Sequence, residues 1–163
     1  MGEFDLIIKE LGIKQKSKFN MIELYRTLKE WFEHQGYTLF EKEYNDIFKK
    51  DKRNLKIKWE AQKEIDDYTK FIIGIGIKIT DYKIITTKTE KLVSGTISMN
   101  FEGGIESDYE EKWSSNPLQL FFRGIYDKII NTPKNEKNEK NLSNNVHEVY
   151  NKTKFFLNMY KFK

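Results

Sequence analysis

The chain has 163 residues, of which 29 are basic and 25 acidic, for a net charge of +4. This length suits one domain with a hydrophobic core. The absence of cysteine excludes a disulfide framework and every cysteine-ligated zinc site. No apolar run is long enough to span a bilayer, and the first residues lack the apolar core of a signal peptide, so we expect a soluble cytoplasmic protein.

The first elements are an apolar segment and a helix. Residues 4–13 are apolar, but their pattern leaves the type of element open. A helix is predicted to follow, because Asn20 can cap it and Glu23 completes a capping box three residues later. Apolar residues recur at helical spacing up to Phe32, and Gly36 is suited to end the helix.

Antiparallel strands are predicted for the middle of the chain, where apolar residues occupy alternate positions. The predicted strands are residues 37–48, 55–64, 70–80 and 91–102. A bulge near Asp81 shifts the apolar phase, and residues 82–87 continue beyond it. Gly103-Gly104 is suited to a hairpin turn that returns into residues 105–111.

Helices are predicted again in the last third. Pro117 favours the first turn of a helix that starts at residues 114–117 and whose apolar face continues to Ile129. A Lys-Asn-Glu repeat predicts a mobile polar loop at about 132–144. A final helix is expected from Val146 to Tyr160.

This order predicts a single α+β domain over residues 1–163. We expect an antiparallel sheet of about five or six strands, packed on one face by helices from both ends of the chain. The most specific version is a curved, helix-grip-like arrangement with the last helix lying across the sheet.

A ligand groove is one candidate site, on the face of strand 70–80 that carries Ile72, Gly74, Gly76 and Lys78. Glycines at alternate strand positions indicate that something approaches this face closely. It could be a small apolar ligand, a neighbouring Trp or Tyr side chain, or a bend in the sheet.

A basic hairpin is the second candidate. It carries Lys49, Lys50, Lys52, Arg53, Lys56 and Lys58. Between Phe48 and Trp59 such a hairpin could hold a nucleic-acid backbone and stack a base. The alternative is a solvated sheet edge that lysines protect from aggregation. Only three of the 29 basic residues are arginine, which weakens the case for nucleic acid.

Residues for catalysis or metal binding are sparse. His34 and His147 are the only histidines, and Asp66-Asp67 suits a turn. An acidic group on the later hairpin could bind a basic partner or a cation, lie near the basic hairpin and neutralise it, or face water, but its spacing matches no metal loop. It comprises Glu102, Glu106, Asp108, Glu110 and Glu111. We therefore expect no cofactor and no metal, and an enzyme is the less favoured class.

Three stretches resemble a group of small uncharacterised archaeal proteins with no assigned activity. They are Glu23-Leu24-Tyr25 with Trp31-Phe32 and Gly36-Tyr37; Trp59-Glu60-Ala61 with Lys63-Glu64-Ile65-Asp66-Asp67-Tyr68; and Lys112-Trp113 with Asn116-Pro117-Leu118 and Phe121-Phe122-Arg123-Gly124-Ile125-Tyr126. The resemblance covers most of the chain. It implies a cytoplasmic archaeal setting and carries no chemistry.

Three functions follow from these features. The leading hypothesis is a non-catalytic binding or scaffold protein that docks a protein partner or a second copy of itself. It rests on the missing catalytic set and on an aromatic content of 15%. The alternatives are a small-molecule binding domain that uses the space over Gly74 and Gly76, and a nucleic-acid binder that uses the basic hairpin. No membrane partner is expected.

Overall fold

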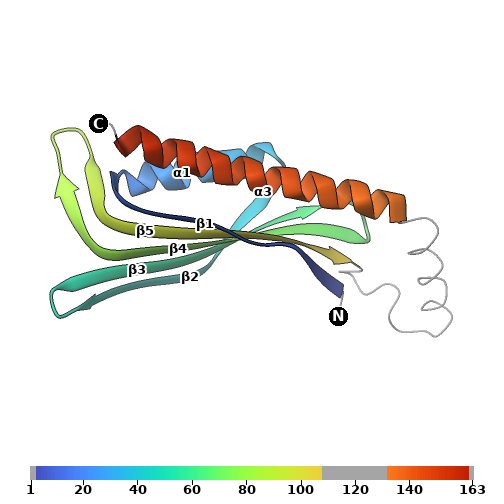
Figure 1. Cartoon of the computed structure of the whole chain (residues 1–163), viewed down its shortest axis with the longest axis horizontal. Coiled ribbons are helices and arrows are strands. Elements are labelled where there is room, and N and C mark those ends of the chain that lie inside the picture. The colour runs from blue at the N-terminus through green and yellow to red at the C-terminus, as the bar shows by residue number, and fades with distance from the viewer. Residues whose placement is uncertain (1–2, 108–131, 162–163) are drawn as a thin grey trace.

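The computed structural model describes residues 3–107 and 132–161 (Figure 1). In these ranges it has five strands and two helices. In chain order they are β1 (Glu3–Phe19), α1 (Met21–His34), β2 (Thr38–Lys49), β3 (Lys52–Glu64), β4 (Thr69–Thr86), β5 (Lys91–Ser107) and α3 (Thr132–Lys161).

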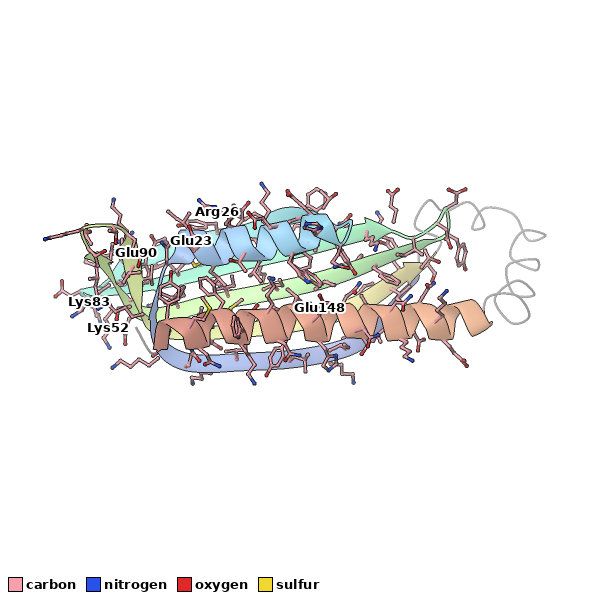
Figure 2. The ribbon with its side chains drawn as sticks, turned by 90° about the horizontal axis from the view of Figure 1, so that it is seen from above. Glu23, Arg26, Lys52, Lys83, Glu90 and Glu148 are labelled. Atoms are coloured by element: carbon pink, nitrogen blue, oxygen red, sulfur yellow. The ribbon has the colours of Figure 1, made fainter. Side chains whose placement is uncertain are left out.

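The strands form one antiparallel sheet in the order β1-β5-β4-β3-β2. The first strand therefore lies beside the last, and β2 is the opposite edge. Both helices lie on one face of the sheet, where α3 runs along β1 and β5 (Figures 1 and 2). This is the predicted α+β architecture, with helices from both ends of the chain on one sheet face. None of the described helices has the length and apolar character needed to cross a membrane.

The core lies between the sheet and the helices. The predicted alternation places one side chain in two on this face, and each large apolar side chain buried there contributes about 1.5–3 kcal/mol. The largest fully buried side chains are Phe19, Leu24, Leu28, Phe32, Ile73, Ile75, Ile77, Ile79, Ile97, Met99, Phe101 and Leu142. They fill the space under both helices.

The predicted ends of α1 are confirmed. The Asn20 side-chain oxygen accepts a hydrogen bond from the Glu23 backbone N–H at 3.1 Å. The Asn20 amide also donates to Glu90 at 3.0 Å, which joins the start of α1 to the end of the β4–β5 turn. Gly36 follows the helix with φ +85°, a conformation that side chains with a Cβ rarely adopt.

Two polar contacts join α3 to the α1 region (Figure 2). The Trp31 indole N–H donates to Glu148 at 3.0 Å. The Asn145 amide donates to the Tyr37 hydroxyl at 2.8 Å. These bonds satisfy polar atoms that would otherwise be buried without partners.

The prediction of a hairpin turn at Gly103-Gly104 is wrong, because β5 continues through both residues. Gly103 lies under α3, where a Cβ atom would come within 2.6 Å of a Val146 methyl group. Gly104 lies under the Phe4 ring on the other face. The two glycines permit close packing on both sides of the sheet.

The prediction of a mobile loop at about 132–144 is also wrong. These residues form the first half of α3, a helix of 30 residues. Leu142 is fully buried and continues the stripe of Val146 and Val149 by one helical turn, which holds the polar repeat to the sheet. The segment of undecided type at 4–13 belongs to β1. The predicted helix beginning at 114–117 lies outside the described residues.

Turn geometry refines the strand boundaries. β3 begins at Lys52 and not at Leu55, because Lys50 and Asp51 alone make the turn from β2, both with positive φ. The predicted bulge is confirmed by a register shift between Thr80 and Lys83, where Asp81 also has positive φ.

Gly103→Ala should destabilise the fold by about 1–3 kcal/mol, because the new methyl group overlaps Val146 and pushes α3 from the sheet. Urea unfolding monitored by circular dichroism measures this loss. Gly12→Ala is the matched control, since a Cβ at Gly12 has only the Met99 carbonyl oxygen within contact range, at 3.9 Å. Equal stability of the two variants would contradict this role of Gly103.

Stability should fall in alkali because burial raises the pKa of Tyr37 to about 12, above its ordinary value of 10. Between these values the unfolded chain releases the phenol proton while the folded chain retains it. The free energy of unfolding therefore decreases with rising pH, by up to about 1.4 kcal/mol per pH unit from this group.

Urea unfolding across this pH range, compared between the wild type and Tyr37→Phe, isolates the contribution of Tyr37. Burial also raises the pKa values of Tyr82 and Tyr160, so both proteins should lose stability. The slope should be shallower for Tyr37→Phe. Parallel slopes would show that the folded chain does not retain the Tyr37 proton.

Candidate functional site

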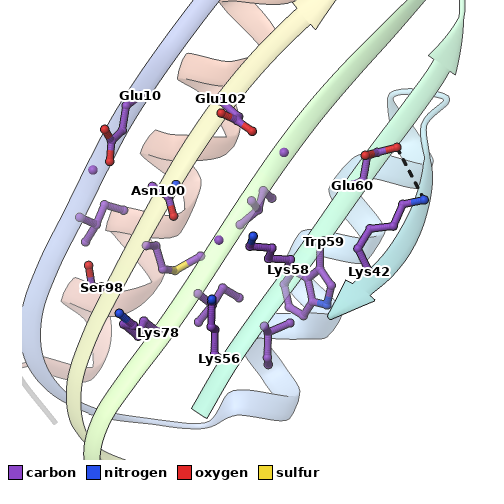
Figure 3. A pocket seen from close by; sticks show the side chains of 18 of the residues that line it. Glu10, Lys42, Lys56, Lys58, Trp59, Glu60, Lys78, Ser98, Asn100 and Glu102 are labelled. Carbon is purple, nitrogen blue, oxygen red and sulfur yellow. Dashed lines mark ion pairs between the residues drawn. The ribbon is translucent and has the colours of Figure 1, made fainter. Parts of the chain in front are cut away.

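The face of the sheet opposite the helices carries a hollow of about 680 Å³ (Figure 3). Of the four residues predicted for the ligand groove, Gly74, Gly76 and Lys78 line it. Ile72 lies two residues before Gly74 on the same strand face and is half-buried. The hollow therefore forms at the place that the alternate glycines indicate.

Polar neighbours from β5 occupy the space over the two glycines. A Cβ atom on Gly74 would lie 3.0 Å from the Glu102 side chain, and one on Gly76 would overlap the Asn100 amide. The sequence predicts a neighbouring Trp or Tyr side chain as one possible occupant of this space. A neighbouring side chain does come close, but it is the Glu102 carboxylate over Gly74 and the Asn100 amide over Gly76. The charged lining suits a polar partner better than an apolar one.

Strand pairing arranges the open face in rows that cross the sheet. We call three of them the basic row, the glycine row and the acidic row. The basic row is Lys56, Lys78, Ser98 and Lys14. The glycine row is Lys58, Gly76, Asn100 and Gly12. The acidic row is Glu60, Gly74 and Glu102, with Glu10 beside them at the irregularity in β1.

Charges of opposite sign therefore lie at opposite ends of the hollow. Figure 3 shows Glu10 and Glu102 toward one end, Lys56 and Lys78 toward the other, and Asn100 between them. The sequence does not predict the separation of Glu10 and Glu102 from the lysines. The pattern at residues 4–13 leaves the type of element open, so the residues of β1 cannot be placed beside β5 from the sequence.

Ion pairs neutralise the part of the face nearest β2. The Glu43 carboxylate lies 3.7 Å from the ammonium groups of Lys56 and Lys58. Lys42 lies 3.9 Å from Glu60. These pairs join three lysines to two glutamates within the chain.

Four charged residues nearer β1 differ from them. Lys14 and Lys78 of the basic row, and Glu10 and Glu102 of the acidic row, have no ion-pair partner among residues 3–107 and 132–161. On this part of the face the two lysines lie in one row, and the two glutamates lie near each other two rows away.

The β2–β3 hairpin holds the residues predicted to contact nucleic acid. Arg53 donates two hydrogen bonds to Asp46, at 2.8 and 3.3 Å, and its guanidinium lies 5.0 Å from the centre of the Tyr82 ring. The Tyr82 hydroxyl donates to the same carboxylate at 2.6 Å. The pKa of Asp46 is lowered, chiefly by the hydrogen bonds from Arg53. The pKa of Tyr82 is raised, first by burial and second by its hydrogen bond to the Asp46 carboxylate. We call this group the Arg53 clamp.

Other basic residues of the hairpin also have acidic neighbours. Lys52 lies 4.0 Å from Asp81, and Glu43 lies between Lys56 and Lys58. Pairing register places Lys56 and Lys58 on the open face and Arg53 on the helix side. Lys49 and Lys50 remain without an ion-pair partner in the described ranges, so the six residues do not form one basic surface.

Large apolar side chains on the outer strand of this hairpin face solvent. The exposed fraction is 57% for Tyr44, 55% for Ile47 and 71% for Phe48. β2 is an edge strand, and nearly all its residues are exposed. Tyr44 and Phe48 share the helix side of the sheet, whereas Ile47 lies on the open side. From the sequence, Phe48 is predicted only as an aromatic residue next to the basic hairpin.

The structure separates the other candidates for chemistry. His34 ends α1, and His147 lies within α3, where its ring contacts the Ser143 carbonyl oxygen. Asp66 accepts hydrogen bonds from the backbone of Tyr68 and Thr69, as a turn residue does. In the described part of the chain, no three His, Asp or Glu residues are grouped to hold a metal ion.

The predicted acidic group is only partly described. Glu102 and Glu106 lie in β5. Asp108, Glu110 and Glu111 lie outside the described residues.

No protein-family model matches this chain. No curated protein matches it either. The resemblance to small archaeal proteins therefore remains a prediction.

Proposed function

We propose that this chain is a non-catalytic binding or scaffold protein whose β2–β3 hairpin docks a protein partner. The observation that carries the proposal is the exposure of Tyr44, Ile47 and Phe48 on one edge strand. Neighbouring exposed apolar side chains on a folded protein are typical of a protein-protein contact.

The size of these side chains supports this role. Full burial of a Phe or Ile side chain against a partner contributes about 1.5–3 kcal/mol. Aromatic residues that fill a partner's pocket often provide most of the binding energy of an interface. Tyr44 and Phe48, which share one face of the strand, can therefore anchor a complex, and Ile47 adds apolar surface on the other face.

The hairpin is also held in shape before binding. The Arg53 clamp joins β2, β3 and Tyr82 of the β4 bulge through one carboxylate. Because the strands are fixed, little conformational entropy is lost at the backbone when a partner binds. Lys52, Arg53, Lys56 and Lys58 of the hairpin have acidic partners in the chain, whereas Lys49 and Lys50 beside Phe48 have none within the described ranges.

Side-chain docking fits this edge better than the addition of a partner strand. β2 has an irregularity between Glu41 and Glu43, where Lys42 lies, and it ends at Lys49. Bulges and edge lysines discourage strand addition in natural sheets. The partner we expect is a protein with an apolar pocket for Phe48 and Tyr44.

Photocrosslinking tests this proposal with a matched pair of positions. A photoreactive phenylalanine analogue is placed at Phe48 of β2 or at Phe155 of α3, which are 71% and 68% exposed. In cells that express the protein natively, Phe48 should give a discrete polypeptide adduct that mass spectrometry identifies. Phe155 should not give that adduct.

A second variant tests the contact itself. With the analogue at Tyr44, Phe48→Lys should strongly reduce formation of the adduct, and Phe155→Lys should leave it unchanged. Equal adducts from Phe48 and Phe155, or none from Phe48, would contradict docking at the hairpin.

A further inference from the structure

The open face of the sheet has a charge distribution that the chain does not balance by itself. Near β2, acidic and basic residues alternate and pair at 3.7–3.9 Å. Nearer β1, Lys14 and Lys78 lie in one row and Glu10 and Glu102 lie near each other two rows away. Like charges that are neighbours repel each other, so this arrangement favours a partner that supplies the opposite charges.

The glycine row lies midway between the basic and acidic rows. Three lysines stand on one side of it and three glutamates on the other. Gly12 is exposed and contributes no side chain to this row, which lets another surface come near the backbone beside β1. The Asn100 amide fills the space over Gly76, and Lys58 lies at the β3 end of the row.

We infer that a second copy of this chain docks on the open face, with a two-fold axis along the glycine row. A half-turn about such an axis reverses the order of the rows and turns the face over. The basic row of each copy then faces the acidic row of the other. Such an interface is isologous, as most homodimer interfaces are.

The dimensions of the face suit a dimer. Five strands about 4.8 Å apart, crossed by the three rows and by the next row on either side at a spacing of about 6.8 Å, cover roughly 800 Å². A standard protein interface buries about this area on each partner. Exposed Lys and Glu side chains fill much of the interface, so we expect a dimer that weakens with salt.

The symmetry of the charges is what points to a second copy. A nucleic acid would be attracted by the basic row but repelled by the acidic row. The dimer contact does not depend on the docking role of the hairpin, although Ile47 and Lys56 of that hairpin lie on the same open face. The axis leaves Tyr44 and Phe48 free, because their side chains lie on the helix side.

Sedimentation velocity of the purified full chain tests the inference. The wild type should dimerise at low salt, and its dissociation constant should rise at least about tenfold between roughly 0.05 and 0.5 M salt. Lys14→Glu with Lys78→Glu makes the face acidic. Glu10→Lys with Glu102→Lys makes it basic. Each double variant should be monomeric by itself.

Mixing the two double variants is the sharper test. An acidic face and a basic face attract each other, so an equimolar mixture should form a heterodimer at low salt. The quadruple variant reverses the sign of the four charges near β1, whereas Lys56 and Glu60 keep their partners within the chain, and it should form homodimers again. Neither result is expected if the substitutions act by disturbing the fold.

Lys137→Glu with Lys140→Glu is the control, since it changes net charge equally on the exposed side of α3 and should leave the dimer intact. Circular dichroism and thermal unfolding verify that every variant is folded. A wild type that stays monomeric at low salt would overturn the inference, whether or not Phe48 gives an adduct. So would a dimer that survives both double substitutions, or mixed variants that remain monomeric.

Discussion

The constraint on which this structure depends is that the sheet buries one face and leaves the other open. Antiparallel strands with side chains alternating between two faces can supply a core and a polar surface from the same residues. Here the odd-numbered positions of β3, β4 and most of β5 pack beneath α1 and α3, whereas the even-numbered positions form the open face. The two helices need the core face for their own apolar stripes, so binding is left to the open face and to the exposed outer part of β2.

The same constraint explains where each proposed contact lies. The helices cover the sheet but leave the outer part of β2 exposed, so Tyr44 and Phe48 remain in solvent on the helix side. The charged rows occupy the other face, on which no described helix lies. A dimer formed through those rows would carry two hairpins free to dock, which is an arrangement suited to a scaffold that joins two partners.

Periodicity predicted the fold well because burial on one face leaves a strong signal in sequence. The alternation of Ile73, Ile75 and Ile77 predicted β4, and the Asn20–Glu23 cap predicted the start of α1. The alternate glycines Gly74 and Gly76, which predict a ligand groove, lie in the lining of a hollow on the open face, and the groove itself stays a prediction. The residues of β1 were not recognised, since this strand carries fewer apolar residues at alternate positions and is irregular between Leu6 and Leu11.

Contacts between distant segments could not be predicted from local patterns. The sequence at Gly103 predicts a turn, because the packing of Val146 against this glycine cannot be read from local sequence. The polar repeat before Leu142 predicts a loop, because the contact of Leu142 with the sheet is equally remote in sequence. The charged rows depend on the register of four strands, which sequence spacing does not specify. The basic run at 49–58 resembled a nucleic-acid site because its carboxylate partners Asp46, Asp81 and Glu43 lie outside the run.

The central claim is that the open face of the sheet is an interface between two copies of the chain. Native mass spectrometry of the full-length protein, purified gently and sprayed at low ionic strength, tests it most directly. The account predicts a species of twice the chain mass that carries no additional small molecule. A monomer, either bare or carrying the mass of a bound small molecule, would contradict it.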